Sequence, residues 1–314
     1  MKVGIIGSGL VGSTSAYAMV MTKSANEVVL IDANEKRAIA EAADIQHAVP
    51  FTHQTDIYAG NYRDLKDAKI VIIAAGASQK PGETRLMLFE KNAAILNKII
   101  PQALEYAPDT IFLIATNPVD VITHISAKIA SEHGVPSSRV IGSGTMLDTA
   151  RFRALLGNHA GVDPQNVHGY VIGEHGDSEV LAWSTIDVGG IPFEDFIRFR
   201  KVDFNEKVKD EIDKGVRNAA YKIIEGKGST YYGIGSAIAR IVDAINRDNR
   251  AVLTVCTVNE DVEGVKDVTL SLPHLISGTG DLGTVPLRLS QEERVLLKKS
   301  AGIIREKIDE YERG

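Results

Sequence analysis

The chain has 314 residues, of which 44% are hydrophobic and 24% charged, so it fits one large globular domain or two joined ones. A formal net charge of −6 argues against nucleic acid as the main partner, because phosphate binding needs a basic surface. The single cysteine, Cys256, excludes an intrachain disulfide, and its apolar surroundings favour a buried, unreactive thiol. The sequence has no signal-peptide pattern, membrane-length apolar run or Cys/His metal cluster, so we expect a cytoplasmic protein without a metal site.

The N-terminus predicts a nucleotide-binding unit. An apolar strand over Lys2–Ile6 is followed by Gly7-Ser8-Gly9-Leu10-Val11-Gly12 and then by a helix over Ser13–Met21. In chain order, the three glycines of this G-x-G-x-x-G motif permit a tight turn, a close approach to a pyrophosphate and close helix–strand packing. The helix N-terminus then faces the phosphates with unpaired N–H groups.

A second predicted strand ends in Asp32, 20 residues after Gly12. A carboxylate at this place accepts hydrogen bonds from an adenosine ribose and repels a 2′-phosphate, which favours NAD over NADP. The alternative is an aspartate that only caps the next helix. Arg37 follows shortly and could soften the discrimination, so NADP stays a minor possibility.

Strands and helices continue to alternate as far as residue 142, which predicts a doubly wound parallel sheet of the Rossmann type. We expect the strand over Val140–Gly142 to close this sheet. The later part predicts a mixed α+β substrate domain, so we divide the chain into a cofactor domain, residues 1–142, and a substrate domain, residues 143–314. Its expected elements are strands over 167–172, 180–186, 251–258 and 268–273, helices over 205–226 and 231–247, and a C-terminal helix opened by the capping box Ser290-Gln291-Glu292-Glu293.

Two polar segments are candidates for substrate contact. The loop Ser78–Arg85 is broken by Pro-Gly and is a candidate lid, whose Arg85 could stabilise charge on a substrate oxygen or be an ordinary surface arginine. Asn117 follows the strand over Thr110–Ala115, at the sheet edge where ligands of α/β proteins bind. Its amide could bind a substrate oxygen or merely cap the following helix.

The strongest catalytic candidate is His175, which lies between two glycines after the predicted strand over 167–172. An imidazole can donate and accept protons near neutral pH, although a solvated turn histidine is the alternative. Asp148 and Arg151 share one face of a predicted helix and could form an ordinary ion pair. They could instead have separate roles, in which Asp148 fixes the tautomer of His175 and Arg151 binds a substrate carboxylate.

Taken together, these motifs resemble the L-lactate/malate dehydrogenase family from end to end, its bacterial L-lactate dehydrogenases most of all. The resemblance implies that NAD is the cofactor, that His175 exchanges the proton with Asp148 as its partner, and that Arg85 polarises the substrate carbonyl. Arg151 would bind the carboxylate, and Asn117 and Thr230 would complete the pocket. The residues at positions that contact NAD in the family are Val11, Asp32, Arg37, Tyr62, Gly76, Ala77 and Asn117, beside Gly7, Gly9 and Gly12.

Gln79 bears on the substrate. In similar malate dehydrogenases an arginine stands here and pairs with the second carboxylate of oxaloacetate. A neutral amide cannot do so, and burying an unpaired carboxylate is costly, so Gln79 points to pyruvate. The implied reaction is reversible hydride transfer between NADH and pyruvate, giving L-lactate. Malate dehydrogenase, a dehydrogenase for bulkier L-2-hydroxy acids and a non-catalytic NAD-binding sensor remain alternatives.

The resemblance also implies regulation and assembly. Arg153 and His168 fall where similar bacterial enzymes bind fructose 1,6-bisphosphate across a two-fold subunit interface, and doubled cations suit a bisphosphate. A surface arginine and a partly buried histidine are the alternative. A homotetramer, a role in glycolysis or fermentation, and packing of the helix over 231–247 against the cofactor domain are further implications.

Overall fold

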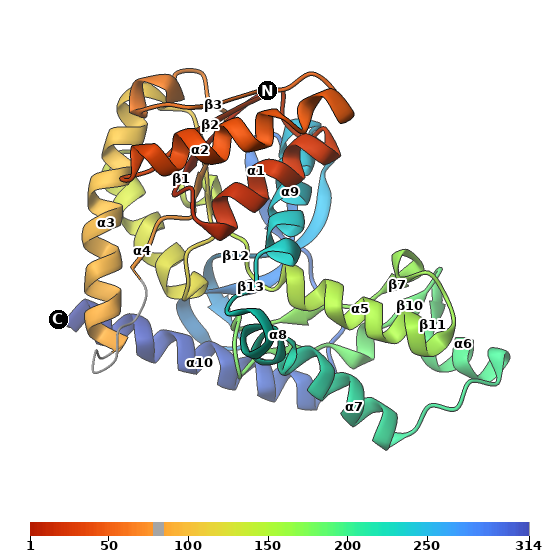
Figure 1. Cartoon of the computed structure of the whole chain (residues 1–314). Helices are drawn as coiled ribbons and strands as arrows, with labels where there is room; N and C mark the ends of the chain where they lie inside the picture. Colours follow the sequence, from red (N-terminus) through yellow and green to blue (C-terminus); the bar gives the residue numbers. More distant parts are fainter. Residues whose placement is uncertain (78–84, 314) are drawn as a thin grey trace.

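The computed structural model describes residues 1–77 and 85–313 (Figure 1). Within these residues, one sheet of nine strands runs through the molecule in the order β14-β13-β12-β6-β5-β4-β1-β2-β3. Six of these strands are parallel and come from the first half of the chain: β1 (Lys2–Ile6), β2 (Glu27–Ile31), β3 (Asp56–Ala59), β4 (Ile70–Ile73), β5 (Ile111–Ile114) and β6 (Val140–Gly142). The predicted doubly wound parallel sheet is confirmed.

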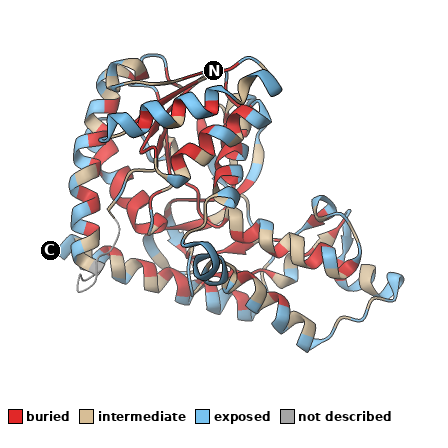
Figure 2. Cartoon of the chain, in the orientation of Figure 1, coloured by how far each residue is buried: buried red, intermediate tan, exposed pale blue. Residues whose placement is uncertain are grey.

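Helices cover both faces of the parallel strands, as their continuous apolar sequences require. One face packs against α1 (Leu10–Thr22), α2 (Glu35–Gln46) and α9 (Tyr232–Asn246). The other face packs against α3 (Arg85–Tyr106) and α4 (Val119–Glu132), and α10 (Gln291–Arg313) continues this layer beside α4, over the antiparallel strands of the same sheet. The buried residues are concentrated on the strands and on the helix faces turned toward them (Figure 2).

The expectation that β6 closes the sheet is wrong. The antiparallel strands β12 (Ala251–Val262), β13 (Val265–Ser277) and β14 (Gly280–Thr284) extend the same sheet, and β12 joins β6 where Cys256 pairs with Gly142. An edge strand with unpaired backbone groups needs a partner, and β12 supplies it. Cys256 is buried here, as expected.

The substrate half contains smaller elements that differ from the expected ones. The predicted strand over 167–172 is divided into β7 (Val167–His168) and β8 (Val171–Ile172), which belong to different small sheets. The predicted helix over 205–226 is divided into α7 (Glu206–Arg217) and α8 (Ala219–Lys227) at Asn218, where φ of −90° and ψ of 0° depart from regular helix values. The other elements of this half are α5 (Met146–Ala160), α6 (Phe193–Arg200), β9 (Val180–Leu181), β10 (Asp187–Val188), β11 (Ile191–Pro192) and the 3-10 turns η4 (Pro164–Asn166) and η5 (Trp183–Thr185). The first half contains three further 3-10 turns, η1 (Val49–Phe51), η2 (Tyr62–Leu65) and η3 (Ser137–Arg139).

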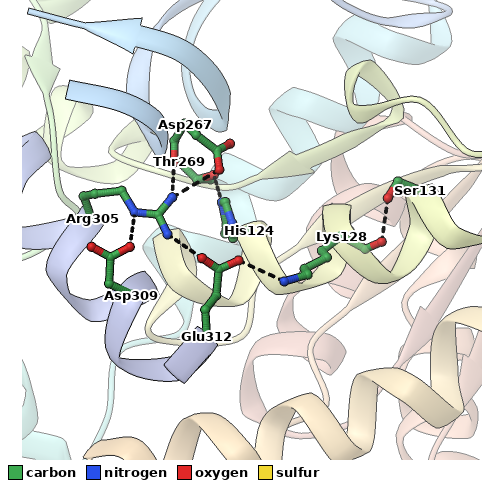
Figure 3. Close-up of polar contacts among 8 residues, drawn as sticks. All are labelled: His124, Lys128, Ser131, Asp267, Thr269, Arg305, Asp309 and Glu312. Atoms are coloured by element: carbon green, nitrogen blue, oxygen red, sulfur yellow. Dashed lines mark hydrogen bonds and ion pairs between the residues drawn. The ribbon is translucent and has the colours of Figure 1, made fainter. Parts of the chain in front are cut away.

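The C-terminal helix α10 is tied to α4 and β13 by an ionic network (Figure 3). The guanidinium of Arg305 lies 3.2 Å from a carboxylate oxygen of Asp267, 2.8 Å from one of Asp309 and 2.7 Å from one of Glu312. Glu312 also pairs with Lys128 of α4 at 2.9 Å. Because α10 contributes side chains to the site described below, this network helps to position that site.

The other end of α10 begins with the predicted capping box, which is confirmed. The Ser290 N–H donates to the Glu293 carboxylate at 2.8 Å, and the Glu293 N–H donates to the Ser290 hydroxyl at 3.2 Å. Between the two ends, α10 packs on β13 and on α4. No helix in the described ranges is long and apolar enough to cross a membrane.

Candidate active site

Two cavities lie at the carboxyl ends of the parallel strands and share Ala74 and Gly76 on their walls. Each has a volume of about 600 Å³. Polar groups and glycines at this edge are the usual ligand site of open α/β sheets. The predicted residues on the first wall are Val11, Gly76, Ala77, Asn117 and His175, and those on the second are Gly7, Gly9, Asp32, Arg37, Tyr62 and Gly76.

The glycine turn fits a bound pyrophosphate. Gly7 has a φ of 104°, and a Cβ there would lie 2.5 Å from the Ala75 nitrogen. A Cβ at Gly12 would lie 1.9 Å from the Gly7 carbonyl oxygen. By contrast, nothing in the described structure lies within 4 Å of a Cβ placed on Gly9, and no side chain caps α1 at that residue. The first N–H groups of α1 are therefore open to a phosphate.

Asp32 lies at the end of β2 and does not act as the helix cap that was its alternative role. The cap of α2 is Asn34, whose side chain accepts the Arg37 N–H. Asp32 instead accepts the Ser8 N–H at 2.6 Å and the Asn34 N–H at 2.8 Å. These bonds fix the carboxylate beside the glycine turn, where a ribose would lie, and Arg37 is exposed nearby.

His175 lies in a loop between β8 and β9 that is held from two sides. Gly173, with a φ of 89°, forms a β-bridge with Ser271 of β13. The next residue, Glu174, donates its N–H to the Ser300 hydroxyl of α10 at 2.8 Å and pairs with Lys307. The His175 side chain is 30% exposed and borders the first cavity.

The Asp148 carboxylate contacts both His175 and Arg151. Its Oδ2 lies 2.6 Å from Nδ1 of His175, and its Oδ1 accepts a hydrogen bond from Nη1 of Arg151 at 2.7 Å. Asp148 is 3% exposed. The two roles that the sequence left as alternatives, an ion pair within the helix and a partner for the histidine, are therefore present together.

Two threonines of α5 place Asp148 opposite the histidine loop. The Thr145 hydroxyl donates to the Val171 carbonyl at 2.5 Å, and the Val171 N–H donates to the Thr149 hydroxyl at 3.0 Å. Val171 belongs to β8, four residues before His175. The first turn of α5 is thereby docked on the strand that leads to His175.

The electrostatics of the site favour a protonated imidazole. Burial lowers the pKa of His175, but the carboxylates of Asp148, Asp120 and Glu179 outweigh it and raise the pKa to about 9. Burial raises the pKa of Asp148, but His175 and Arg151 outweigh it, so the net pKa is lowered. An ionised Asp148 beside an imidazolium is the arrangement of an acid that is ready to donate a proton.

Arg151 and Thr230 line a third cavity of about 490 Å³, which is mostly apolar and is bordered by Leu147, Ile223 and Tyr231. In the described part of the chain, two cations border this pocket: Arg151, which is held by Asp148, and Lys227, whose ammonium lies over the Tyr231 and Tyr232 rings. A guanidinium fixed in an apolar pocket suits a small carboxylate substrate. Asn117 is exposed at the edge of the first cavity and does not cap α4, whose N-cap is Pro118. Gln79 and the Arg85 side chain lie outside the described residues.

Two family models divide the chain between them. The NAD-binding domain of lactate/malate dehydrogenases matches residues 1–142, and their α/β C-terminal domain matches residues 145–313. The chain belongs to the lactate/malate dehydrogenase family. Like the family, it is an NAD-dependent oxidoreductase, and NAD is its cofactor.

Individual members of the lactate/malate dehydrogenase family resemble the chain over nearly its full length. An L-lactate dehydrogenase of Geotalea daltonii is 55% identical over 309 residues, 98% of this chain and 99% of that protein. One from Thermus aquaticus is 52% identical and covers 97% of both chains. Among solved structures, a lactate dehydrogenase from a Medee basin deep-sea metagenome library is 40% identical with a TM-score of 0.94, covering 99% of this chain and 98% of that one.

Sequence reasoning about this family member missed several residues that shape the site. Asn92, fully buried on α3, accepts the Ala77 N–H at 2.8 Å and so holds the wall of the first cavity. Arg217 of α7 donates to the carbonyl oxygens of Asp177 and Glu179, which fixes the far end of the histidine loop. In the sequence, the available signal for Asn92 was a polar residue among apolar ones on the same helix face. No such pattern marked Arg217.

The two residues predicted to bind a sugar bisphosphate lie close together. Arg153 donates its Nε–H to the Gly169 carbonyl at 2.9 Å, and its guanidinium lies 5.3 Å from the centre of the Tyr170 ring. His168 is exposed on β7, next to Gly169. Among the described residues, no group of three or more His, Cys, Asp or Glu side chains could hold a metal ion.

Proposed function

We propose that this member of the family is an L-lactate dehydrogenase that interconverts pyruvate and L-lactate. The observation that carries the proposal is the Asp148 carboxylate, which holds a proton-donating imidazole with one oxygen and a carboxylate-binding guanidinium with the other. A small 2-oxo acid needs these two groups at a fixed separation. The names of the relatives, which are L-lactate dehydrogenases at 45–55% identity, support the same substrate.

Each residue contributes a separate part of the reaction. Bound NADH supplies the hydride. The N–H groups at the start of α1 bind the pyrophosphate, and Asp32 binds the adenosine ribose. Arg151 grips the pyruvate carboxylate with two parallel hydrogen bonds.

The proton is moved by His175. Its Nδ1 is bonded to Asp148, so Nε2 is the nitrogen that donates to the substrate oxygen during reduction and accepts the proton during oxidation. While the imidazole is protonated, the Asp148 carboxylate stabilises its positive charge. Positioned proton transfer of this kind supplies about 10²–10⁴-fold in rate.

Four further assignments follow from the family resemblance. Arg85 polarises the carbonyl oxygen, Asn117 donates to it, and Thr230 orients the substrate. Gln79 leaves room for the methyl group of pyruvate and cannot neutralise a second carboxylate.

The proposal also covers an effector site, the oligomeric state and the boundary between the two domains. We assign Arg153 and His168 to a fructose 1,6-bisphosphate site, and the chain to a homotetramer in the cytoplasm. Support for an anion site comes from the exposed His168 imidazole and from the Arg153 guanidinium, which bonds to the carbonyl of Gly169, the residue after His168. We place the domain division after residue 142, which the limits of the two family models support.

The experiment that tests the function is the loss of NADH absorbance with pyruvate, oxaloacetate and a bulkier 2-oxo acid measured in parallel. We expect a strong preference for pyruvate. A preference for oxaloacetate would make the chain a malate dehydrogenase, in which another cation replaces the missing arginine. NADH binding without turnover of any 2-oxo acid would identify a sensor instead.

A further inference from the structure

We propose that Asp120 is a positioning residue for the proposed acid, because its carboxylate anchors the main chain of His175 to the cofactor-binding half of the molecule. This inference rests on the proposed role of His175. Asp120 is the second residue of α4 and comes three residues after Asn117, at the carboxyl end of β5. The proposed chemistry leaves this residue without a role.

The anchor is a buried, direct contact. Asp120 is 2% exposed, and its Oδ2 accepts the His175 N–H at 2.8 Å. A hydrogen bond to a charged acceptor is stronger than one between neutral groups, and a buried N–H without a partner is costly. The other oxygen, Oδ1, is buried without a well-aligned hydrogen bond among the described residues, and the carboxylate also faces the buried Cys256 thiol of β12, whose pKa is raised by burial and by this carboxylate. The His175 N–H is the hydrogen-bond donor that contacts the Asp120 carboxylate directly and in good alignment.

The backbone around His175 explains why an anchor is needed. Gly173 and Gly176 lie on either side, and glycine resists backbone rotation less than other residues. The Nδ1–H of His175 donates to Asp148, which restrains the ring. The loop is also held before His175, at Glu174, and after it, at Asp177, but these bonds do not hold the main chain at His175 itself. Asp120 restrains the main chain itself. Two carboxylates, one on the ring and one on the backbone, together fix where Nε2 lies.

The position of Asp120 also links the acid to the cofactor side. The turn that carries Asp120 carries Asn117, which borders the same cavity as Val11 and Gly76. The histidine loop and Asp148 come from the second half of the chain, whereas Asp120 comes from the first. The His175–Asp120 bond thus sets the distance between the proton donor and the half of the molecule that binds the nicotinamide. A displacement of about 1 Å between reacting groups can lower a rate 10²-fold.

The negative charge of Asp120 has a second effect, on the pKa of His175, which a neutral amide at this position would not have. Burial raises the pKa of Asp120 to about 6, so the group is ionised at neutral pH, where the N-terminus of α4 also favours its charge. A negative charge beside the imidazolium raises the pKa of His175. The other titratable or charged groups near the imidazole and Asp120 are Asp148 and Arg151 on α5, Glu174 and Glu179 on the histidine loop, Arg217 on α7, the Cys256 thiol on β12 and Lys307 on α10. Burial raises the pKa of Glu179 to about 8.

The test compares Asp120→Ala, Asp120→Asn and the control Thr123→Val in the full-length enzyme. Thr123 lies one turn further along α4, is fully buried, and contacts the Cys256 thiol. For each variant we would measure the melting temperature, NADH binding by fluorescence, kcat and KM for pyruvate, and the pH dependence of kcat/KM. Asp120→Ala removes the acceptor, whereas Asp120→Asn keeps an oxygen acceptor and removes the charge.

We expect Asp120→Ala to lower kcat by about 10–100-fold while NADH binding stays within about twofold of Thr123→Val. In Asp120→Asn we expect a smaller loss and an alkaline limb of the pH profile that lies at lower pH, which a merely structural role would not produce. The proposal is overturned if Asp120→Ala matches Thr123→Val in kcat, or if Asp120→Asn leaves the alkaline limb in place. If Asp120→Ala does not fold, the limb in Asp120→Asn decides alone.

A His175→Asn variant separates this inference from the proposed function. Full activity of His175→Asn would overturn the proposed function itself. An inactive His175→Asn beside a fully active Asp120→Ala would overturn only the anchoring role.

Discussion

His175 and Asp148 are in contact although 27 residues separate them in the chain, with 2.6 Å between Nδ1 of the imidazole and Oδ2 of the carboxylate. The contact assigns the two ring nitrogens to different tasks. Nδ1 is held by the protein, and Nε2 is left to face the substrate. The proposed chemistry therefore depends on Asp148 as much as on the histidine.

Replacing Asp148 with asparagine should lower kcat by about 10²–10⁴-fold. The amide keeps the size of the side chain but can present an N–H to Nδ1, which favours the wrong tautomer, and it does not stabilise an imidazolium. Stopped-flow or steady-state oxidation of NADH by pyruvate measures the loss. Asp281→Asn is the matched control, since Asp281 lies 3.0 Å from the buried His274 in the β13–β14 region and should leave kcat within about twofold. Equal losses in the two variants would contradict a specific role for Asp148.

Pyruvate reduction should keep its kcat/KM up to about pH 8 and lose it as pH rises through about 9. The reason is that reduction needs the protonated imidazole and that the pKa of His175 is raised to about 9, burial being outweighed by the nearby carboxylates. Lactate oxidation needs the neutral imidazole, so its kcat/KM should rise over the same range. Both profiles can be measured with saturating cofactor in buffers of constant ionic strength. A reduction limb near pH 6.5, the ordinary pKa of histidine, would show that the carboxylates do not act on the free enzyme as inferred.

Replacing Gln79 with arginine should shift the substrate preference toward oxaloacetate by at least about tenfold in the ratio of kcat/KM values. The new guanidinium can pair with the second carboxylate, whereas the methyl group of pyruvate gains nothing from it. Gln79→Leu is the control, because it changes the side chain without adding charge. If both variants change the ratio equally, the charge at this position is not what selects the substrate.

Fructose 1,6-bisphosphate should increase activity at low pyruvate concentration, and Arg153→Met should abolish the increase. The substitution removes the cation that lies beside the exposed His168 and keeps much of the side-chain length. Initial rates across pyruvate concentrations, with and without the effector, provide the measurement at pH 6 and pH 7.5. Arg198→Met removes an exposed arginine of the same half and should respond like the unmodified enzyme. Absence of any effect of the sugar bisphosphate at either pH would remove the proposed site.

Replacing Arg305 with methionine should lower the free energy of unfolding by about 1–2 kcal/mol, because one half-buried guanidinium holds carboxylates from β13 and from two turns of α10. Urea denaturation followed by circular dichroism gives the value. Arg294→Met is the control on the same helix, since Arg294 makes one partly exposed pair with Glu263 and should change stability by less than about 0.5 kcal/mol. A similar small change for Arg305 would mean that the network contributes no more than a surface ion pair.

The parallel half of the sheet was predictable because its strands, apart from β3, are short apolar runs followed by a helix. The errors have physical causes. The helix expected over 205–226 has no proline within it and no glycine next to Asn218 that would mark an interruption there, so the break at this residue is not visible in the sequence. The strand β14 contains two glycines and an aspartate, and its extended form depends on pairing with β13. Strand propensity therefore did not indicate it.

The site was predictable to the extent that its residues lie in motifs. Helical spacing placed Asp148 and Arg151 on one face but could not choose between their roles. The choice depends on the docking of α5 on β8 through Thr145 and Thr149, which is a tertiary contact. Asp120 escaped notice for a related reason: an acid in the first turn of a helix is ordinary, and only the folded chain brings it to the His175 N–H.

The junction between β6 and β12 has a consequence for how the chain reaches this structure. The edge of β6 at Gly142 is covered only after Cys256, more than a hundred residues later in the chain, has been synthesised and has paired with it. During synthesis on the ribosome, the first half can form its parallel strands while that edge stays open to other chains. Pairing over such a long separation is slow, because a large loop must close first. The two halves of the enzyme, although matched by separate family models, therefore complete one sheet together, and truncation before residue 251 should yield an aggregation-prone fragment in place of an independent cofactor domain.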